Sequence, residues 1–192
     1  MNYTIEKRCL DVLLALILII PSLVLVIIFA FLIYFTDFHN PFFVQKRLGY
    51  KGKEFNLIKL RSMRIDAEKS GAQWATKNDS RVTWIGNFIR KTRIDELPQL
   101  INILKGDMSF VGPRPERKEL ADQFVETIPT FNERLEAIPG LTGLAQLSGG
   151  YDLSPSEKLV YDLEYIEKAN VMLDLKLIIK TVKVVFTGEG AR

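Results

Sequence analysis

The segment VLLALILIIPSLVLVIIFAFLIYFT, residues 12–36, decides the architecture of this 192-residue chain. It holds 25 residues without a charge, between Asp11 and Asp37. A membrane-spanning helix needs about 20 predominantly apolar residues, so the segment is long enough to cross a bilayer. A secretory signal peptide is excluded, because its apolar region covers about 7–15 residues and ends in small residues, whereas bulky ones stand here. The segment therefore predicts a helix inserted in a membrane.

Two features of this segment argue against simple crossing. Pro21 and Ser22 lie near its middle, where a proline costs ~3 kcal/mol in an ordinary helix, although membrane helices tolerate it. Basic residues, which prefer the cytoplasmic side, also flank both ends. A helix that breaks at Pro21 and returns would place both flanks on one side, each arm reaching about 15–20 Å. These properties favour re-entrant and spanning helices equally. The predicted membrane anchor comprises Lys7, Arg8, Pro21 and Ser22, and the following basic flank comprises Lys46, Arg47, Lys51 and Lys53.

After Asn40-Pro41 the composition becomes that of a soluble domain, so we divide the chain into residues 1–40 and 41–192. Turn residues, caps and apolar spacing predict the local elements. These are two strands within 42–60 around a turn at 50–53, helices at 83–92, 95–105, 117–127, 156–169 and 172–186, and a glycine-rich loop at 139–150. The prediction is an α+β fold, mostly helical, with one short β-hairpin.

Two of the predicted helices are amphipathic. The helix at 83–92 is expected to carry its apolar residues on one side, and the helix at 172–186 carries three lysines at helical spacing. A basic amphipathic helix suits an anionic membrane surface, and equally a solvated lysine face on a helix packed against a core. These residues are Trp84, Ile85, Phe88 and Ile89 in the first helix, and Lys176, Lys180 and Lys183 in the second.

Composition excludes several kinds of site. The net charge of +3 is too small to indicate a nucleic-acid partner. With one histidine and one cysteine, the chain has too few ligands for an ordinary zinc site and cannot form an internal disulfide. Glycine-rich phosphate loops and dinucleotide fingerprints are absent from the sequence. Carboxylates and arginines remain as the candidates for catalysis.

Asp95-Glu96 is the strongest catalytic candidate. Both carboxylates stand at the start of a predicted helix, with Asp95 as its cap, where the helix dipole favours negative charge. Mutual repulsion can raise the pKa of one of them, and an ionised aspartate can attack phosphorus. An ordinary acidic helix start is the competing interpretation.

Basic residues around this pair strengthen the case. Arg90 lies five residues upstream, and Arg114 stands between Pro113 and Pro115 in a stiff segment. Arginine forks match phosphate oxygens, so both are candidate phosphate ligands. Lys59 and Arg61 could bind phosphate or form an internal ion pair.

Taken together, these residues resemble the small monotopic polyprenyl-phosphate phosphoglycosyl transferases of the bacterial sugar transferase family. The resemblance covers nearly the whole chain, and the stretch 95–115 is its most specific part. The matching motifs are Lys7-Arg8 with Asp11, the apolar run with Pro21, Gln45-Lys46-Arg47, Lys59-Leu60-Arg61-Ser62-Met63, Asp95-Glu96-Leu97-Pro98-Gln99-Leu100, Lys105-Gly106-Asp107-Met108-Ser109, Val111-Gly112-Pro113-Arg114-Pro115 and Pro139-Gly140-Leu141-Thr142-Gly143.

The resemblance implies a re-entrant helix in the bacterial inner membrane, a cytosolic catalytic domain at 41–192, and a Mg²⁺-dependent reaction in two steps. Asp95 would attack a UDP-sugar and release UMP, and polyprenyl phosphate would then take the phosphosugar, initiating the assembly of a cell-surface glycan. Asp95 and Glu96 would hold Mg²⁺, and Arg90, Pro113 and Arg114 would contact the donor.

One motif departs from the family. Many relatives carry Gly-Arg where this chain has Gly149-Gly150, so either another basic residue substitutes or the loop serves a different sugar. A non-catalytic scaffold of this fold and a glycosyltransferase that releases UDP are the competing functions. Helices at a membrane surface could also support a homodimer.

Overall fold

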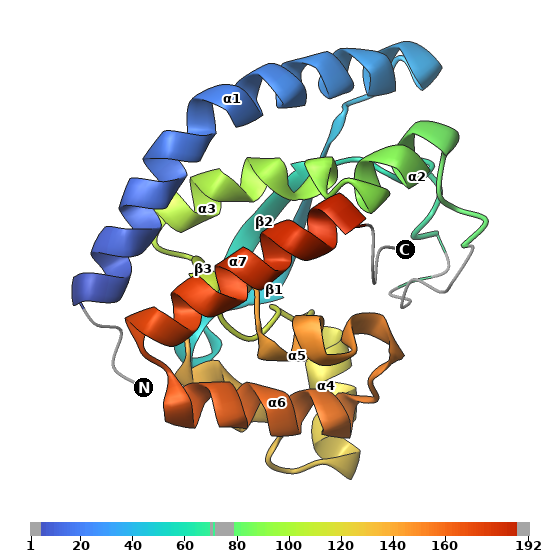
Figure 1. Cartoon of the computed structure of the whole chain (residues 1–192). Coiled ribbons are helices and arrows are strands. Elements are labelled where there is room, and N and C mark those ends of the chain that lie inside the picture. The colour runs from blue at the N-terminus through green and yellow to red at the C-terminus, as the bar shows by residue number, and fades with distance from the viewer. Residues whose placement is uncertain (1–4, 70, 72–78, 188–192) are drawn as a thin grey trace.

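The computed structural model describes residues 5–69, 71 and 79–187, and within them it confirms a mostly helical α+β fold. A long N-terminal helix arches over a compact domain, as Figure 1 shows. The helices are α1 (Ile5–Asp37), α2 (Trp84–Lys91), α3 (Leu100–Lys105), α4 (Lys118–Thr127), α5 (Leu144–Ser148), α6 (Pro155–Lys168) and α7 (Val171–Thr187). The strands are β1 (Phe42–Leu48), β2 (Glu54–Leu60), β3 (Ser109–Val111) and β4 (Gly140–Thr142). The 3-10 turns are η1 (Tyr50–Gly52), η2 (Ile94–Gln99), η3 (Phe131–Glu136) and η4 (Gly150–Asp152).

Helix α1 stays helical through Pro21, and it bends about halfway along, as Figure 1 shows. The re-entrant path of its two halves through a membrane stays a prediction. Among the described residues α1 is the one helix long and apolar enough to cross a membrane, and only 17% of its most apolar stretch is buried. Pro21 is exposed on the helix and Ser22 is buried against the domain. An apolar helix that is so exposed needs an apolar environment, which indicates membrane association.

The first turns of α1 are held by buried charges of the domain. Lys7 Nζ lies 2.5 Å from Asp174 Oδ2 of α7 and donates to Val111 O and Tyr165 Oη, both at 3.1 Å. Lys7 therefore binds protein groups rather than lipid headgroups. Arg8 does the same, because its guanidinium donates to the carbonyl oxygens of Ile103 and Leu104 at the end of α3, at 2.6 and 2.7 Å.

The last turn of α1 is held by Arg61, the residue that follows β2. Arg61 donates to both carboxylate oxygens of Asp37, at 2.5 and 2.7 Å, and its Nε donates to Asn40 O at 2.9 Å. Both ends of the long helix are thus attached to one domain. The boundary between residues 1–40 and 41–192 stays a prediction, since α1 and the domain share these contacts and a common core.

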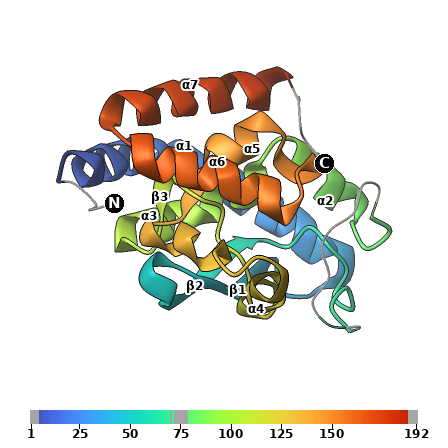
Figure 2. The same cartoon turned by 90° about the horizontal axis from the view of Figure 1, so that it is seen from below.

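The predicted hairpin is confirmed. Strands β1 and β2 pair antiparallel from Phe42 opposite Leu60 to Leu48 opposite Glu54. Figure 2 shows this hairpin and α7 on opposite sides of the domain, with α3, β3 and α6 between them.

Helix α2 differs from the prediction in its faces. Ile85 and Ile89 are buried in a core cluster, whereas Trp84 and Phe88 are 78% and 51% exposed. The four apolar residues therefore form two faces, because positions one apart on a helix do not coincide. On α7 the lysines Lys176, Lys180 and Lys183 are exposed, as both interpretations of that helix require.

Two further predictions need correction. The segment 95–105 begins as η2 after Arg93, whose φ of 60° ends the preceding helix, so Asp95 is the second residue of a turn and not a cap. Gly106 ends α3 as predicted, with a φ of 89°. The predicted loop at 139–150 contains β4 and α5, and β4 pairs parallel with β3. Three-residue strands are too short to show an apolar period, so sequence patterns miss them.

Candidate active site

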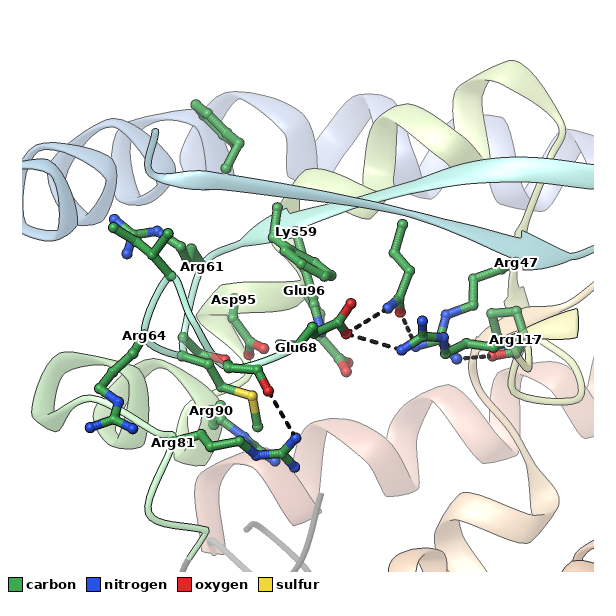
Figure 3. Close-up of a pocket in the computed structure, with 18 of the residues that line it drawn as sticks. Arg47, Lys59, Arg61, Arg64, Glu68, Arg81, Arg90, Asp95, Glu96 and Arg117 are labelled. Atoms are coloured by element: carbon green, nitrogen blue, oxygen red, sulfur yellow. Dashed lines mark hydrogen bonds and ion pairs between the residues drawn. The ribbon is translucent and has the colours of Figure 1, made fainter. Parts of the chain in front are cut away.

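A pocket of about 770 Å³ opens between the hairpin, η2 and the segment that follows β3. Its lining is strongly basic, with nine cationic side chains against four carboxylates (Figure 3). The cations are Arg47, Lys59, Arg61, Arg64, Arg81, Arg90, Arg114, Arg117 and Lys158, and the carboxylates are Glu68, Asp95, Glu96 and Glu116. Such a surface suits a substrate with several negative charges, such as a diphosphate.

Turn η2 places the two predicted catalytic carboxylates in this wall. Ile94 and Leu97 pack against a core cluster that includes Val26 and Ile33 of α1. Asp95 and Glu96 point the other way, toward the pocket (Figure 3). The apolar residues on either side of the pair therefore hold it directly beneath the exposed helix.

Asp95 is 7% exposed, and its Oδ1 is buried with no hydrogen-bond partner among the described residues. Burial and the neighbouring charge of Glu96 raise the pKa of Asp95 to about 7, against the opposing charges of Lys59, Arg90 and Arg93. A buried carboxylate oxygen without a partner is costly, so its presence in a pocket is a strong sign of function.

Glu96 is the opposite case. Burial works to raise its pKa, but the charges of Arg114 and Arg93 and a hydrogen bond from Arg114 outweigh burial and lower it. Arg114 Nη2 donates to Glu96 Oε1 at 2.6 Å, and Arg93 Nη1 lies 3.7 Å from the same oxygen. Glu96 is therefore ionised at neutral pH, and it positions the Arg114 guanidinium at the pocket. The ionisation that the sequence attributed to a helix dipole comes from these arginines.

Lys59, on β2, lies beside the carboxylate pair. Burial lowers its pKa to about 8, against the raising effect of Asp95. Its ammonium lies 5.1 Å from the ring centroid of Phe43 on the paired strand. A lysine with this pKa is largely charged at neutral pH and remains able to exchange a proton.

Of the other predicted binding residues, Arg90 and Arg61 line the pocket and Pro113 does not. Arg90, in the last turn of α2, lines the pocket. Arg61 also lines it, but its bidentate bond to Asp37 makes it the internal ion pair that the sequence left open. Pro113 borders a second, very small cavity and not the large pocket, and its carbonyl accepts from Gly140 N at 2.9 Å.

At the far end of the pocket, sequence reasoning named Arg47, for phosphate or an ion pair, but missed Glu68 and Arg117. Glu68 Oε1 accepts from Gln45 Nε2 and Arg117 Nη1, both at 3.0 Å, and Arg47 donates to Pro115 O at 3.1 Å. Gln45 and Arg47 belong to a motif of the resemblance, and their alternation on a strand could have placed both side chains on one face. Arg117 and Glu68 come from separate loops, and no sequence signal joins them.

Lys158, from α6, also lines the pocket. In the sequence it follows Gly150, the position where many relatives carry an arginine. Gly150 itself lies in η4 with a φ of 56°, a conformation that glycine adopts readily. Gly150 does not line the pocket, so which residue takes the place of the family arginine stays a prediction.

The donor set fits a Mg²⁺ ion held jointly with a substrate. Histidine, cysteine and acidic side chains form no group of three that could hold a metal within the described residues. Mg²⁺ is commonly bound by one or two carboxylates together with substrate phosphates and water. Asp95, with its unpartnered oxygen, and the adjacent Glu96 would supply that pair.

Comparison with known proteins identifies the family of this chain. The family model described as bacterial sugar transferase matches residues 2–188. The chain belongs to the bacterial sugar transferase family. This confirms the resemblance drawn from the motifs and the prediction of a transferase.

Curated relatives match most of this bacterial sugar transferase. An Aeromonas hydrophila UDP-N-acetylgalactosamine-undecaprenyl-phosphate N-acetylgalactosaminephosphotransferase is 41% identical over 99% of the chain and 46% of its own length. A Caulobacter vibrioides UDP-glucose:undecaprenyl-phosphate glucose-1-phosphate transferase is 37% identical over 97% and 72%. The exopolysaccharide production protein ExoY of Sinorhizobium fredii is 34% identical over 97% and 88%. The chain thus spans less than half of the Aeromonas relative.

Proposed function

We propose that the protein transfers a sugar-1-phosphate from a UDP-sugar to undecaprenyl phosphate, through a covalent intermediate on Asp95. The names of the relatives support the donor and acceptor classes, and two of them use different sugars. The observation that carries the proposal is the buried, unpartnered Asp95 carboxylate in a pocket lined by nine basic side chains.

In the first step, a carboxylate oxygen of Asp95 attacks the sugar-linked phosphorus of the donor. The bond from that phosphorus to the bridging oxygen breaks, and UMP leaves with the electron pair. In the second step, a phosphate oxygen of the acceptor attacks the same phosphorus and releases the Asp95 carboxylate. The products are UMP and an undecaprenyl diphosphate sugar, and all atoms are accounted for.

The side chains of the pocket have separate tasks in this reaction. Arg90 and Arg114 bind phosphate oxygens, and Glu96 fixes the orientation of Arg114. Lys59 and Arg90 counter the raised pKa of Asp95 and favour its ionised form. Mg²⁺, when held by Asp95, Glu96 and the diphosphate, would neutralise phosphate charge and stabilise the leaving group.

The attachment of α1 supports insertion from one side of the membrane. A 33-residue helix is about 50 Å long at 1.5 Å per residue, yet Lys7 and Asp37 at its two ends bind the same domain. A helix that crossed the bilayer would carry its ends to opposite sides. We therefore propose a monotopic protein of the bacterial inner membrane whose catalytic domain, residues 41–192, faces the cytoplasm and initiates glycan assembly.

Topology is tested by cysteine labelling. In a Cys9→Ser background, which removes the exposed native thiol, cysteines at positions 3 and 51 should react with an impermeant reagent from the same side. Reaction from opposite sides would establish a spanning helix.

The reaction is tested with donor labelled in the sugar-linked phosphate. Without acceptor, the wild-type protein should take up label on Asp95 and release one UMP per label, and added undecaprenyl phosphate should discharge it. The donors tested are a panel of UDP-sugars that includes UDP-glucose and UDP-N-acetylgalactosamine, which stand in the names of the relatives. Release of UDP would identify a plain glycosyltransferase, and absence of any product would leave a scaffold.

A further inference from the structure

Four aromatic side chains gather on the last turns of α1 and the residue that follows it, and we call them the aromatic cluster. Neighbouring rings are in contact, with centroids 5.6 to 6.4 Å apart. All four side chains are nevertheless exposed, by 42% to 67%. The members are Phe31, Tyr34, Phe35 and Phe38.

Phe38 joins the cluster through an uncommon backbone conformation. Its φ is 56°, in the left-handed region that glycine and asparagine usually occupy at helix ends and that bulky residues rarely adopt. The backbone N of Phe38 donates to Tyr34 O at 2.6 Å, and its ring meets Tyr34 and Phe35 edge to face. The chain therefore turns back at Phe38 and places one more ring on an exposed apolar surface.

The aromatic cluster is continuous with the basic pocket. Directly after Phe38, the residues His39, Asn40, Phe42 and Phe43 line the pocket. Arg61 holds this junction in place, since it binds Asp37 and Asn40 O together. Along the chain, the aromatic cluster therefore borders residues that line the cationic pocket, and we call this border the mouth of the pocket. It lies where α1 leads down into β1 (Figure 1).

A role as a simple interfacial anchor explains the cluster poorly. Aromatic anchors at the membrane–water interface are chiefly tryptophan and tyrosine, whose polar atoms reach water. Three of these four residues are phenylalanine, which has no polar atom. The surface suits an apolar partner whose polar end enters the adjacent pocket.

We propose that the aromatic cluster binds the first isoprene units of the polyprenyl phosphate acceptor and guides its phosphate past His39 and Asn40 to Asp95. This inference rests on the proposed function, which supplies the acceptor. A phosphate at the end of an apolar chain matches both parts of the mouth, and flat, methyl-branched isoprene units pack against ring faces. The other candidate occupant, a membrane phospholipid, becomes an outcome of the test.

The first experiment compares acceptor kinetics in two leucine variants. Phe35→Leu/Phe38→Leu keeps the surface apolar but removes two rings, and we expect KM for undecaprenyl phosphate to rise about fivefold. The control Trp84→Leu removes a ring on α2 that is even more exposed, at 78% against 63% and 67%, and should keep the wild-type KM. An unchanged KM in the double variant, or an equal rise in the control, overturns the inference.

The second experiment uses the wild-type protein, so it does not depend on how the variants fold. A polyprenyl phosphate with a diazirine in its first isoprene units should label residues 31–43, and excess unlabelled polyprenyl phosphate should abolish this labelling. A phospholipid with a diazirine in its acyl chain should label α1 along its length, and excess polyprenyl phosphate should not reduce this labelling. Polyprenyl labelling elsewhere, or phospholipid labelling confined to the cluster, overturns the inference.

The donor half-reaction separates the two proposals. If wild-type protein acquires label from the donor and the cross-links map elsewhere, the acceptor site proposed here is wrong and the proposed function stands. If no label is acquired from any donor, the proposed function fails, whatever the cross-links show.

Discussion

Two lysine–aspartate couples in this protein have different environments. Lys7 and Asp174 lie 2.5 Å apart, each is at most 4% exposed, and Tyr165 and Val111 O complete their hydrogen bonds. Lys59 and Asp95 also attract each other, but Asp95 Oδ1 accepts no hydrogen bond from the described residues.

The difference separates structure from chemistry. At the first couple, the partners satisfy each other and fix α1 to α7. At the second, burial outweighs attraction, raises the pKa of Asp95 and lowers that of Lys59. A buried carboxylate without a hydrogen-bond partner destabilises the fold. Such a group is therefore expected only at a functional site, where its reactivity is needed.

The largest expected effect is on turnover in Asp95→Asn. The amide cannot act as the nucleophile, so we expect activity to fall by at least about 10⁴-fold. Because the variant removes a buried carboxylate with an unsatisfied oxygen, its thermal midpoint should equal or exceed that of the wild type. UMP release and calorimetry measure the two quantities, and appreciable residual turnover would contradict the covalent route.

The same chemical change at the other couple should destabilise the fold instead. Asp174→Asn leaves the Lys7 ammonium buried without its counter-ion, and we expect a loss of about 3 kcal/mol in the free energy of unfolding. Denaturant unfolding in detergent gives the value. A variant as stable as the wild type would remove the distinction between the two couples.

Arg114→Lys should have a smaller effect on catalysis. A lysine keeps the charge but loses the guanidinium fork, so kcat/KM for the donor should fall by roughly 10- to 100-fold. Arg64→Lys is the matched control, because Arg64 lines the pocket with a side chain that is 60% exposed and pairs with exposed Asp66. An equal loss in both variants would assign the effect to pocket charge alone.

The smallest effect concerns pH. Since the pKa of Asp95 is raised to about 7, protonation below that pH should remove the nucleophile and lower kcat/KM for the donor. Lys59→Met removes a cation that favours the ionised form, so the acidic limb should move upward by roughly half a pH unit. The measurement is kcat/KM between pH 5.5 and 9, a range that includes the Asp95 pKa of about 7. A shift of the acidic limb to lower pH in the variant would contradict this prediction.

Local chemistry explains which predictions succeeded. The hairpin at 42–60 and the end of the helix predicted at 95–105 depend on neighbouring residues, and the structure confirms them. The strand at 140–142 escaped prediction because it exists only by pairing with residues 109–111. The faces of α2 were misassigned because burial of Ile85 and exposure of Trp84 depend on where that helix docks.

By itself the sequence determined that an apolar helix precedes a basic, mostly helical domain, that the chain carries a transferase motif set, and that Asp95 and Glu96 are its candidate carboxylates. These features follow from composition, spacing and motif, which act over a few residues. The tertiary structure decided which charges are satisfied, since Lys7 meets Asp174 and Arg61 meets Asp37 across long separations while Asp95 keeps an oxygen without a partner. The energy of a charge is set by its burial and its neighbours in space, and only the folded chain supplies both.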